Sequence, residues 1–284
     1  MTTETPLRQT AAVNGVELNV WEWPGERLAS CALFCHATGF HGRCWDRIIA
    51  RLPGWHVFAV DMRGHGRSSK PDPPYRWRPL GDDLAELARA LGLRGAIGVG
   101  HSMGGHSLVR AAALHPDAFA RLVLLDPVIY ARALYNGPRV EEHFAARRRN
   151  RWASAAEMYA RYVERAPFAS WDRGVLHDYC DYGLTPAPDG DGFVLACPPA
   201  VEASIYAHSN APDADIYEEI ESLRIPVRVI RSARPQAPGV LDMSASPTVP
   251  DLASRFRFGE DIHDPEHGHL LPMEAPGMVA DWIR

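Results

Sequence analysis

The stretch Gly98-Val99-Gly100-His101-Ser102-Met103-Gly104-Gly105 constrains the fold of this chain more than any other. The short apolar run Ala96-Ile97 before it indicates the end of a buried strand, and residues Ser107 to Leu114 after it are typical of a helix. Ser102 is therefore expected where a strand turns sharply into a helix, with glycines two residues away on both sides that let neighbouring backbone approach. In this setting the Gly-x-Ser-x-Gly pattern predicts a nucleophilic serine. The N–H groups of the following helix would stabilise negative charge on a substrate oxygen.

Further strand signals alternate with helix signals along the chain. Val16–Trp23 is predicted as an edge strand, Asp82–Leu91 as an amphipathic helix, Arg255–Phe258 as a final short strand, and the residues from about Pro276 as a terminal helix. Buried strands are predicted at Ala32–Cys35, His56–Val60, Leu122–Leu125 and Pro226–Ile230. This order predicts an α/β fold with a mostly parallel central sheet and helices on both faces. Sites in such sheets lie at the carboxyl ends of the strands, where the loop at His36, Ser102 and Asp126 would meet.

The pattern of buried strands stops between Ile129 and His208, a stretch rich in arginine and aromatic residues. We interpret this stretch as a mostly helical cap inserted after the strand that ends at Asp126. The predicted core domain therefore comprises residues 1–128 and 209–284, and the cap residues 129–208. The run Arg147-Arg148-Arg149 could suggest RNA binding, but a solvated helix face is the simpler interpretation. The cap aromatics are expected to form its core, with a few lining a substrate pocket.

Composition narrows the range of partners. The chain has 284 residues and a net charge of −5, which argues against a nucleic-acid or anionic-membrane partner. No apolar run approaches the ~20 residues of a membrane span, and residues 1–10 lack the apolar core of a signal peptide. The five cysteines form no Cys-x-x-Cys pair, so we expect reduced, mostly buried thiols, a cytoplasmic location and no zinc site. The oligomeric state stays open.

Four motifs spread over the chain outside the cap carry a resemblance to a known family. They are His36-Ala37, Asp61-Met62-Arg63-Gly64-His65-Gly66-Arg67-Ser68, Gly100-His101-Ser102-Met103-Gly104-Gly105, and Gly268-His269 followed by Leu-Leu-Pro-Met-Glu. Together they resemble the α/β-hydrolase fold family. Ala37 departs from the family pattern, which has glycine after the histidine, yet it leaves a backbone N–H available. The resemblance implies an oxyanion hole made by the backbone N–H groups of Thr38 and Met103.

The serine needs a base and an orienting acid. Of the 13 histidines, His269 is favoured because it follows the last strand, in the serine, acid, histidine order of the family, and His267 is its nearest rival. His36, His65 and His101 are expected to hold loops by hydrogen bonds. For the acid we favour Asp242, which follows the penultimate strand within a Gly-x-x-Asp sequence, as is usual in the family. Asp126 is the alternative, because some family members carry the acid at that point.

These residues predict a serine hydrolase that cleaves a carboxylic ester, lactone or related small acyl substrate through an acyl-enzyme, with no metal or organic cofactor. One alternative is a carbon–carbon bond hydrolase that acts on a diketone-type substrate with the same triad. Another is a ligand sensor that keeps the fold and turns over very slowly. An aspartate-nucleophile enzyme is disfavoured because position 102 is serine.

Overall fold

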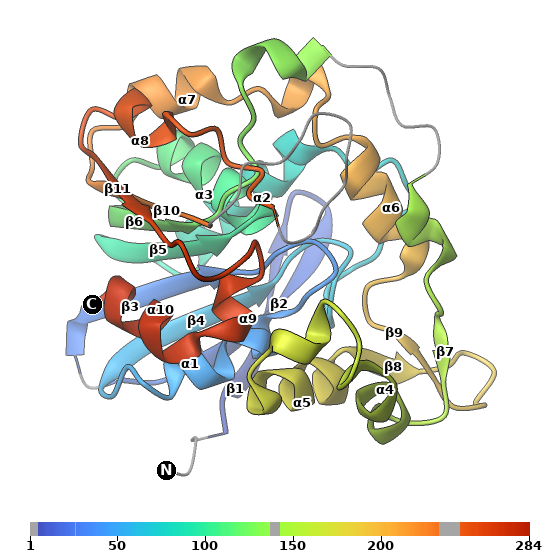
Figure 1. Cartoon of the computed structure of the whole chain (residues 1–284). Coiled ribbons are helices and arrows are strands. Elements are labelled where there is room, and N and C mark those ends of the chain that lie inside the picture. Colours follow the sequence, from blue (N-terminus) through green and yellow to red (C-terminus); the bar gives the residue numbers. More distant parts are fainter. Residues whose placement is uncertain (1–4, 26, 137–142, 233–244) are drawn as a thin grey trace.

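A central sheet organises the computed structural model of this chain, which describes residues 5–25, 27–136, 143–232 and 245–284. The strands of this sheet lie in the order β1-β2-β4-β3-β5-β6-β10-β11 (Figure 1). Their bounds are β1 (Leu7–Val13), β2 (Val16–Trp23), β3 (Arg27–Cys35), β4 (Trp55–Asp61), β5 (Ala96–His101), β6 (Phe119–Leu125), β10 (Val227–Arg231) and β11 (Gly259–His263). β1 with β2 and β2 with β4 pair antiparallel, and the remaining neighbours pair parallel. The predicted mostly parallel sheet is confirmed.

Helices cover both faces of the sheet (Figure 1). One face carries α2 (Trp77–Ala90), α3 (Met103–Leu114), α7 (Tyr217–Ser222) and α8 (Leu252–Arg255), and the other carries α1 (Asp46–Ile49), α9 (Leu271–Glu274) and α10 (Pro276–Ile283). Strand β6 illustrates the consequence. Leu122 and Leu124 pack into the core of the first face, whereas Val123 and Leu125 pack into that of the second. Successive side chains of a strand point to opposite faces, so a strand covered on both sides is apolar throughout.

Helix α2 begins five residues before the predicted Asp82. Leu80, Leu84 and Leu87 recur at helical spacing and are buried against the sheet. Pro79 lies in the first turn, where its missing N–H has no intrahelical acceptor in any case. The helix therefore tolerates a residue that would break it further along.

Both predictions about the sheet edges were wrong. β2 is not an edge strand, because β1 pairs along its outer side from Leu7 to Val13. The final strand is β11 rather than Arg255–Phe258, which spans the end of α8 and the connection into the strand. β11 pairs only with β10 among the described strands, and its side chains are mostly exposed. An exposed edge strand needs no apolar pattern, so hydrophobicity gave no signal for it.

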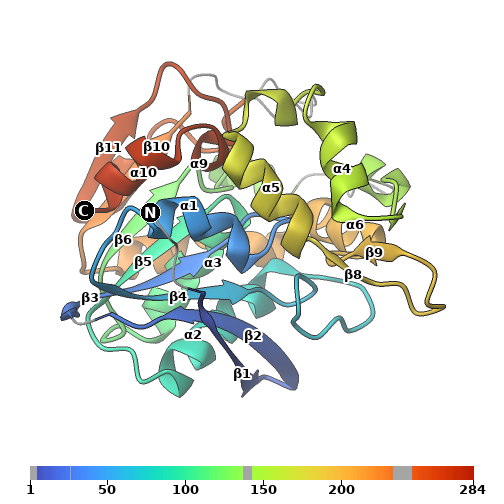
Figure 2. The same ribbon diagram turned by 90° about the horizontal axis from the view of Figure 1, so that it is seen from below.

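Most of the described chain between β6 and α7 lies beside the central sheet (Figures 1 and 2). It contains α4 (Ala155–Tyr162), α5 (Arg173–Tyr182), α6 (Pro199–Ala207) and several short 3₁₀ turns. It also contains a small antiparallel sheet of β7 (Arg151–Trp152), β9 (Phe193–Leu195) and β8 (Leu184–Pro186), in that order. The sequence predicts a mostly helical stretch here and gives no sign of these strands. Strands of two or three residues are too short to show the alternation on which strand prediction depends.

Helix α5 is fastened to the first helical turns after β3. Arg47 donates two hydrogen bonds to Asp178, from Nε at 2.7 Å and from Nη2 at 2.9 Å. Arg43 Nη2 donates to the Tyr182 hydroxyl at 3.1 Å, and its guanidinium lies 3.8 Å from the centre of that ring. Figure 2 shows α5 running beside α1. Paired, bidentate contacts of this kind hold one element in one orientation on another.

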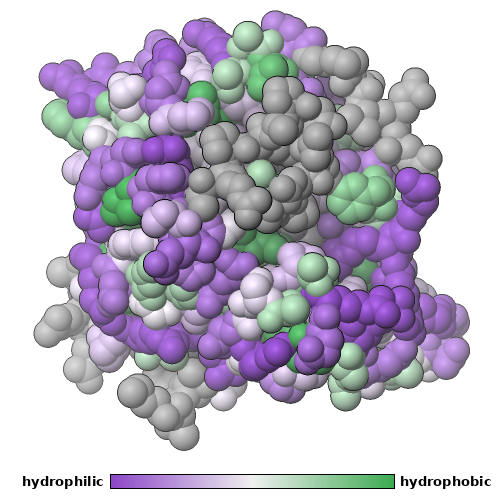
Figure 3. Space-filling model, viewed as in Figure 1, coloured by the Kyte–Doolittle hydropathy of each residue, from purple (hydrophilic) through white to green (hydrophobic). Residues whose placement is uncertain are grey.

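The described surface is largely hydrophilic in the view of Figure 3. No helix among the described residues combines the length and apolar character that a membrane crossing requires. All five cysteines are free thiols, four of them buried and Cys31 partly exposed. Within the same described ranges, no three His, Cys, Asp or Glu side chains gather in a way that could hold a metal ion.

Candidate active site

Ser102 lies at the turn between β5 and α3, as predicted. Its φ of +56° is in the left-handed region that non-glycine residues rarely adopt. The turn is tight enough that a Cβ on Gly104 would lie 2.3 Å from the Cys35 carbonyl oxygen, and a Cβ on Gly100 would lie 2.7 Å from the Gly104 backbone. Both flanking glycines are thus required by close backbone approach. The turn holds Ser102 at the N-terminus of α3.

His269 is the histidine that meets the serine. Its Nε2 lies 3.0 Å from Ser102 Oγ, although 167 residues separate the two in sequence. His269 is presented by the turn between β11 and α9, and its backbone oxygen accepts a hydrogen bond from His101 Nε2 at 2.8 Å. Ser102 is 5 % exposed and His269 7 %, so the contact is shielded from bulk water. His267 instead donates from Nδ1 to Asp264 at 2.8 Å.

Asp126, at the end of β6, completes a chain of hydrogen bonds. His269 Nδ1 donates to Asp126 Oδ2 at 2.7 Å. The carboxylate is fully buried and also accepts from the Ser232 N–H and hydroxyl, both at 3.0 Å, from Ser246 Oγ at 2.5 Å and from Thr248 Oγ1 at 3.3 Å. Burial alone would raise the pKa of Asp126, but these hydrogen bonds and the His269 ring hold it below its usual value. The group is therefore an anion facing the ring.

Asp242, the acid favoured from the sequence, lies outside the described residues. The alternative, Asp126, is the carboxylate whose contact with His269 is described. Sequence reasoning also missed the donors Ser232, Ser246 and Thr248. The only signal for them is a small cluster of hydroxyl residues downstream of β10, a pattern that is common in loops and points to no particular partner.

Thr38 and Met103 lie next to each other beside Ser102. Thr38 Oγ1 contacts Met103 Sδ at 3.4 Å, and both residues are buried. Met103 is the first residue of α3, so its N–H has no acceptor within the helix. Across the described part of the chain, neither backbone N–H donates a hydrogen bond. An oxyanion hole requires backbone N–H donors that are free of other acceptors.

Two buried histidines hold the loop that carries Thr38. His36 Nε2 accepts from the Met62 N–H at 2.9 Å, and His65 Nε2 accepts from the Gly39 N–H at 3.0 Å. The Nδ1 of each ring donates to a nearby backbone carbonyl. Burial lowers the pKa of His36 to about 3 and that of His65 well below its usual value, so both rings stay neutral. They act as loop supports, in agreement with the prediction.

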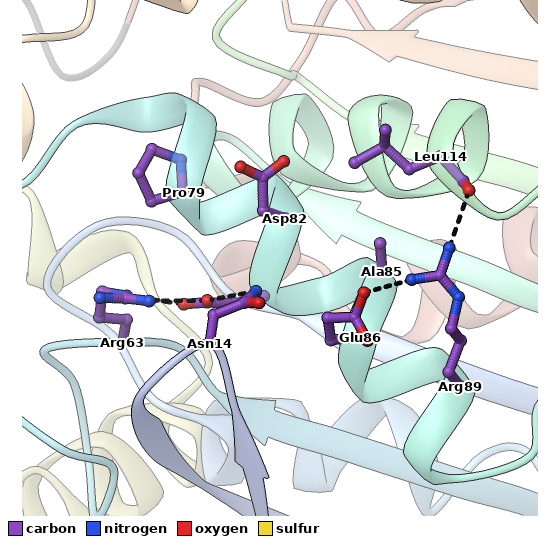
Figure 4. A pocket seen from close by; sticks show the side chains of 9 residues that line it. Asn14, Arg63, Pro79, Asp82, Ala85, Glu86, Arg89 and Leu114 are labelled. Atoms are coloured by element: carbon purple, nitrogen blue, oxygen red, sulfur yellow. Dashed lines mark hydrogen bonds and ion pairs between the residues drawn. The ribbon is translucent and has the colours of Figure 1, made fainter.

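A separate recess in the described surface lies between the β1–β2 turn and α2 (Figure 4). It has a volume of about 440 Å³. Several of its polar side chains pair with one another: Arg63 donates to Asp83 at 2.7 Å, Asn14 donates to the same carboxylate at 3.1 Å, and Arg89 pairs with Glu86. The recess contains none of the residues predicted for chemistry, so we place no activity there.

Known proteins resemble this chain along most of its length. The family model described as "Alpha/beta hydrolase family" matches residues 32–282. "Lipase LipV" of Mycobacterium tuberculosis is 30 % identical over 257 residues, which cover 89 % of this chain and 91 % of the lipase. "2-(acetamidomethylene)succinate hydrolase" of Mesorhizobium japonicum is 39 % identical over 105 residues, 36 % of this chain and 38 % of that protein. A solved structure of E-2-(acetamidomethylene)succinate hydrolase superimposes with a TM-score of 0.76 at 21 % identity, covering 98 % of this chain and 97 % of the other.

Proposed function

This chain belongs to the alpha/beta hydrolase family, and we propose that it is a serine hydrolase cleaving a carboxylic ester, lactone or related small acyl substrate. The observation that carries the proposal is the relay from Ser102 Oγ through His269 to Asp126, with contacts of 3.0 and 2.7 Å. The family is enzymatic, and the relatives named lipase, esterase and hydrolase support this class of reaction.

In the proposed first half-reaction, Ser102 Oγ attacks the acyl carbonyl while His269 Nε2 takes its proton. Asp126 keeps the other ring nitrogen protonated and stabilises the imidazolium that forms. The tetrahedral oxyanion would sit against the N–H groups of Met103 and Thr38. One such donor contributes about 3 kcal/mol to transition-state stabilisation.

The first half-reaction ends when His269 gives its proton to the leaving alcohol, and the serine ester remains for the second. Water then enters, His269 removes one of its protons, and the resulting hydroxide attacks the acyl carbon. Collapse of this second intermediate releases the acid and returns the proton to Ser102. Each proton in the cycle moves between Ser102, His269 and the reactants, so no cofactor takes part in these steps.

We further propose that residues 129–208 act as a cap over the core formed by 1–128 and 209–284. An apolar cluster supports this role, because it joins cap residues Trp171 and Tyr179 to Phe40 and Leu270 in the loops after β3 and β11. Such a cap would enclose a small-molecule substrate near Ser102. The expected cytoplasmic location stays a prediction.

The test is Ser102→Ala assayed against a p-nitrophenyl ester. Removal of the nucleophile should lower turnover by several orders of magnitude. A variant with a near wild-type rate would refute the mechanism. The alternatives are separated by two further measurements. Faster cleavage of a dienone acid than of simple esters would favour carbon–carbon bond hydrolysis, and a fluorophosphonate-reactive protein that never deacylates natural-type esters would favour a sensor.

A further inference from the structure

The turn that carries His269 starts far from Ser102 in the sheet. His269 follows β11, whereas Ser102 follows β5, and β10 and β6 lie between these two strands (Figure 1). Neighbouring strands are about 4.8 Å apart, so the ends of β11 and β5 are separated by about 14 Å. The chain after β11 must therefore reach back across two strands to bring the imidazole to the serine, and strand pairing does not fix how far it reaches.

One hydrogen bond ties this turn to the end of β5. His101, the last residue of β5, donates from Nε2 to the His269 backbone oxygen at 2.8 Å. The other hydrogen bonds that the backbone of residues 267–269 makes within the described ranges stay between residues 264 and 274. His101 thus connects the backbone of the base to the strand of the nucleophile.

The ring of His101 is fully buried, and among the described residues its Nδ1 has no hydrogen-bond partner. A carbonyl oxygen accepts only from a protonated nitrogen, so the ring carries its proton on Nε2. Burial lowers the pKa of His101 to about 3, so the ring is neutral at neutral pH and keeps this donor. The rings of Phe40 and His269, with centroids 6.1 and 5.1 Å away, pack against it and restrict its rotation. The His269 oxygen therefore faces one fixed N–H group.

The bond from His101 is independent of the proton transfers at the His269 ring. In the proposed cycle the imidazole takes and returns protons, and the Ser102 hydroxyl is absent while the serine is acylated. The bond from His101 goes to the backbone oxygen and engages neither ring nitrogen of His269. It can therefore hold the base at the same distance from the serine, 3.0 Å between Nε2 and Oγ, throughout the cycle. This distance matters, because a displacement of about 1 Å at a reacting group can cost about 100-fold in rate.

We infer that His101 is a positioning residue for the base: its Nε2–H fixes the backbone of His269 and thereby the reach of the imidazole to Ser102. The inference rests on the proposed function, because it gives His101 a part in the step that His269 catalyses. Loss of the donor should lower kcat, since the base is then held less precisely. KM should change little, because the fully buried His101 side chain is not exposed to substrate.

The test compares two replacements of His101 that differ in the donor. A methionine side chain has no N–H, whereas a glutamine amide can place one near the position of Nε2. His101→Met should lower kcat for a p-nitrophenyl ester by about 10- to 100-fold with little change in KM. His101→Gln should recover most of this loss. The rate at which a fluorophosphonate labels Ser102 should fall and recover in the same order, because labelling needs the same activated serine.

His106 provides the matched control. Its Nε2 also lies 2.8 Å from a backbone oxygen, that of Ala214, its ring is also fully buried, and its Nδ1 also has no partner in the described part of the chain. The acceptor lies before α7 and not in the turn that carries the base. His106→Met should therefore reduce the free energy of unfolding about as much as His101→Met does, yet leave kcat close to that of the wild type.

A His101→Met variant with wild-type kcat overturns the inference, as does a His101→Gln variant that recovers none of the loss. A His106→Met variant that loses as much kcat also overturns it, because a general loosening of the core would then explain both. If His101→Met fails to fold, His101→Asn decides in its place, since its shorter amide cannot reach the His269 oxygen and kcat should fall below that of His101→Gln. Each of these failures leaves the proposed function standing if the wild type, but not Ser102→Ala, turns over the ester. Wild-type protein without turnover overturns both.

Discussion

Replacing Asp126 with asparagine probes the proposed relay most directly, because its polar surroundings dictate how an amide must sit. Oδ1 accepts from the backbone N–H of Ser232 at 3.0 Å. That donor cannot rotate, so an amide NH₂ in the Oδ1 position would face another donor. The asparagine oxygen must therefore occupy the Oδ1 position, and its NH₂ the Oδ2 position, which faces His269 Nδ1 at 2.7 Å.

The consequence for His269 is a change of tautomer. Facing an NH₂ group, Nδ1 must accept, and the ring proton moves to Nε2, 3.0 Å from Ser102 Oγ. A ring protonated there cannot take the serine proton. The expected loss in kcat is about 10⁴-fold, which corresponds to about 5.5 kcal/mol of transition-state stabilisation. Initial rates with a p-nitrophenyl ester measure it, and the urea-unfolding midpoint checks that the variant is folded.

Asp242→Asn serves as the paired variant, since it makes the same chemical change at the other acid considered. It should retain wild-type kcat within a few-fold. The reverse result, a large loss at position 242 with Asp126→Asn near wild type, would refute the reasoning and restore the acid first favoured from the sequence.

Two further predictions concern folding. Gly104→Ala should destabilise the protein by several kcal/mol in urea unfolding, because its Cβ would lie 2.3 Å from the Cys35 carbonyl oxygen. Gly277→Ala is the control and should be neutral or stabilising, because its Cβ would meet nothing nearer than 3.5 Å. Equal effects of the two substitutions would contradict the packing argument. The free energy of unfolding should also fall as pH drops below 6.5, because the histidines bind protons in the unfolded chain but stay neutral when buried in the folded one. The folded pKa values are lowered to about 3 for His36 and His101 and to about 4 for His41 and His106, and that of His65 is also lowered. Asp46, whose pKa burial raises to about 6, offsets one of these histidines. The four histidines near 3 and 4, less Asp46, leave three net protons, which correspond to a slope of about 4 kcal/mol per pH unit at its steepest. Unfolding midpoints that stay level between pH 7 and 5 would exclude this effect.

Sequence reasoning finds the elements whose place in the fold demands particular residue types. β6 is buried on both faces and must be apolar at every position. Ser102 could be placed because two glycines are needed for the backbone contacts around it. β11 was misplaced because its side chains face solvent and carry no such requirement.

The site was harder to predict where the contacts depend only on how distant segments pack together. Asp126 and Asp242 both follow predicted strands, and nothing in either local sequence says which carboxylate reaches His269. The buried orientation of the Arg148 side chain could not be predicted either, because its partners Glu202 and Tyr179 are 54 and 31 residues away in sequence. Contacts between distant segments depend on how the layers pack, which residue periodicity does not encode.

The dispersed origin of the relay has a consequence for the chain before it is fully folded. Ser102, Asp126 and His269 come from three separate connections, and Ser232 and Ser246 from a fourth. Contacts between segments so far apart in sequence form only after the strands that carry them have paired. Until β10 and β11 dock, Ser102 is an ordinary alcohol with no base at hand, so a partly folded chain gains no reactive nucleophile.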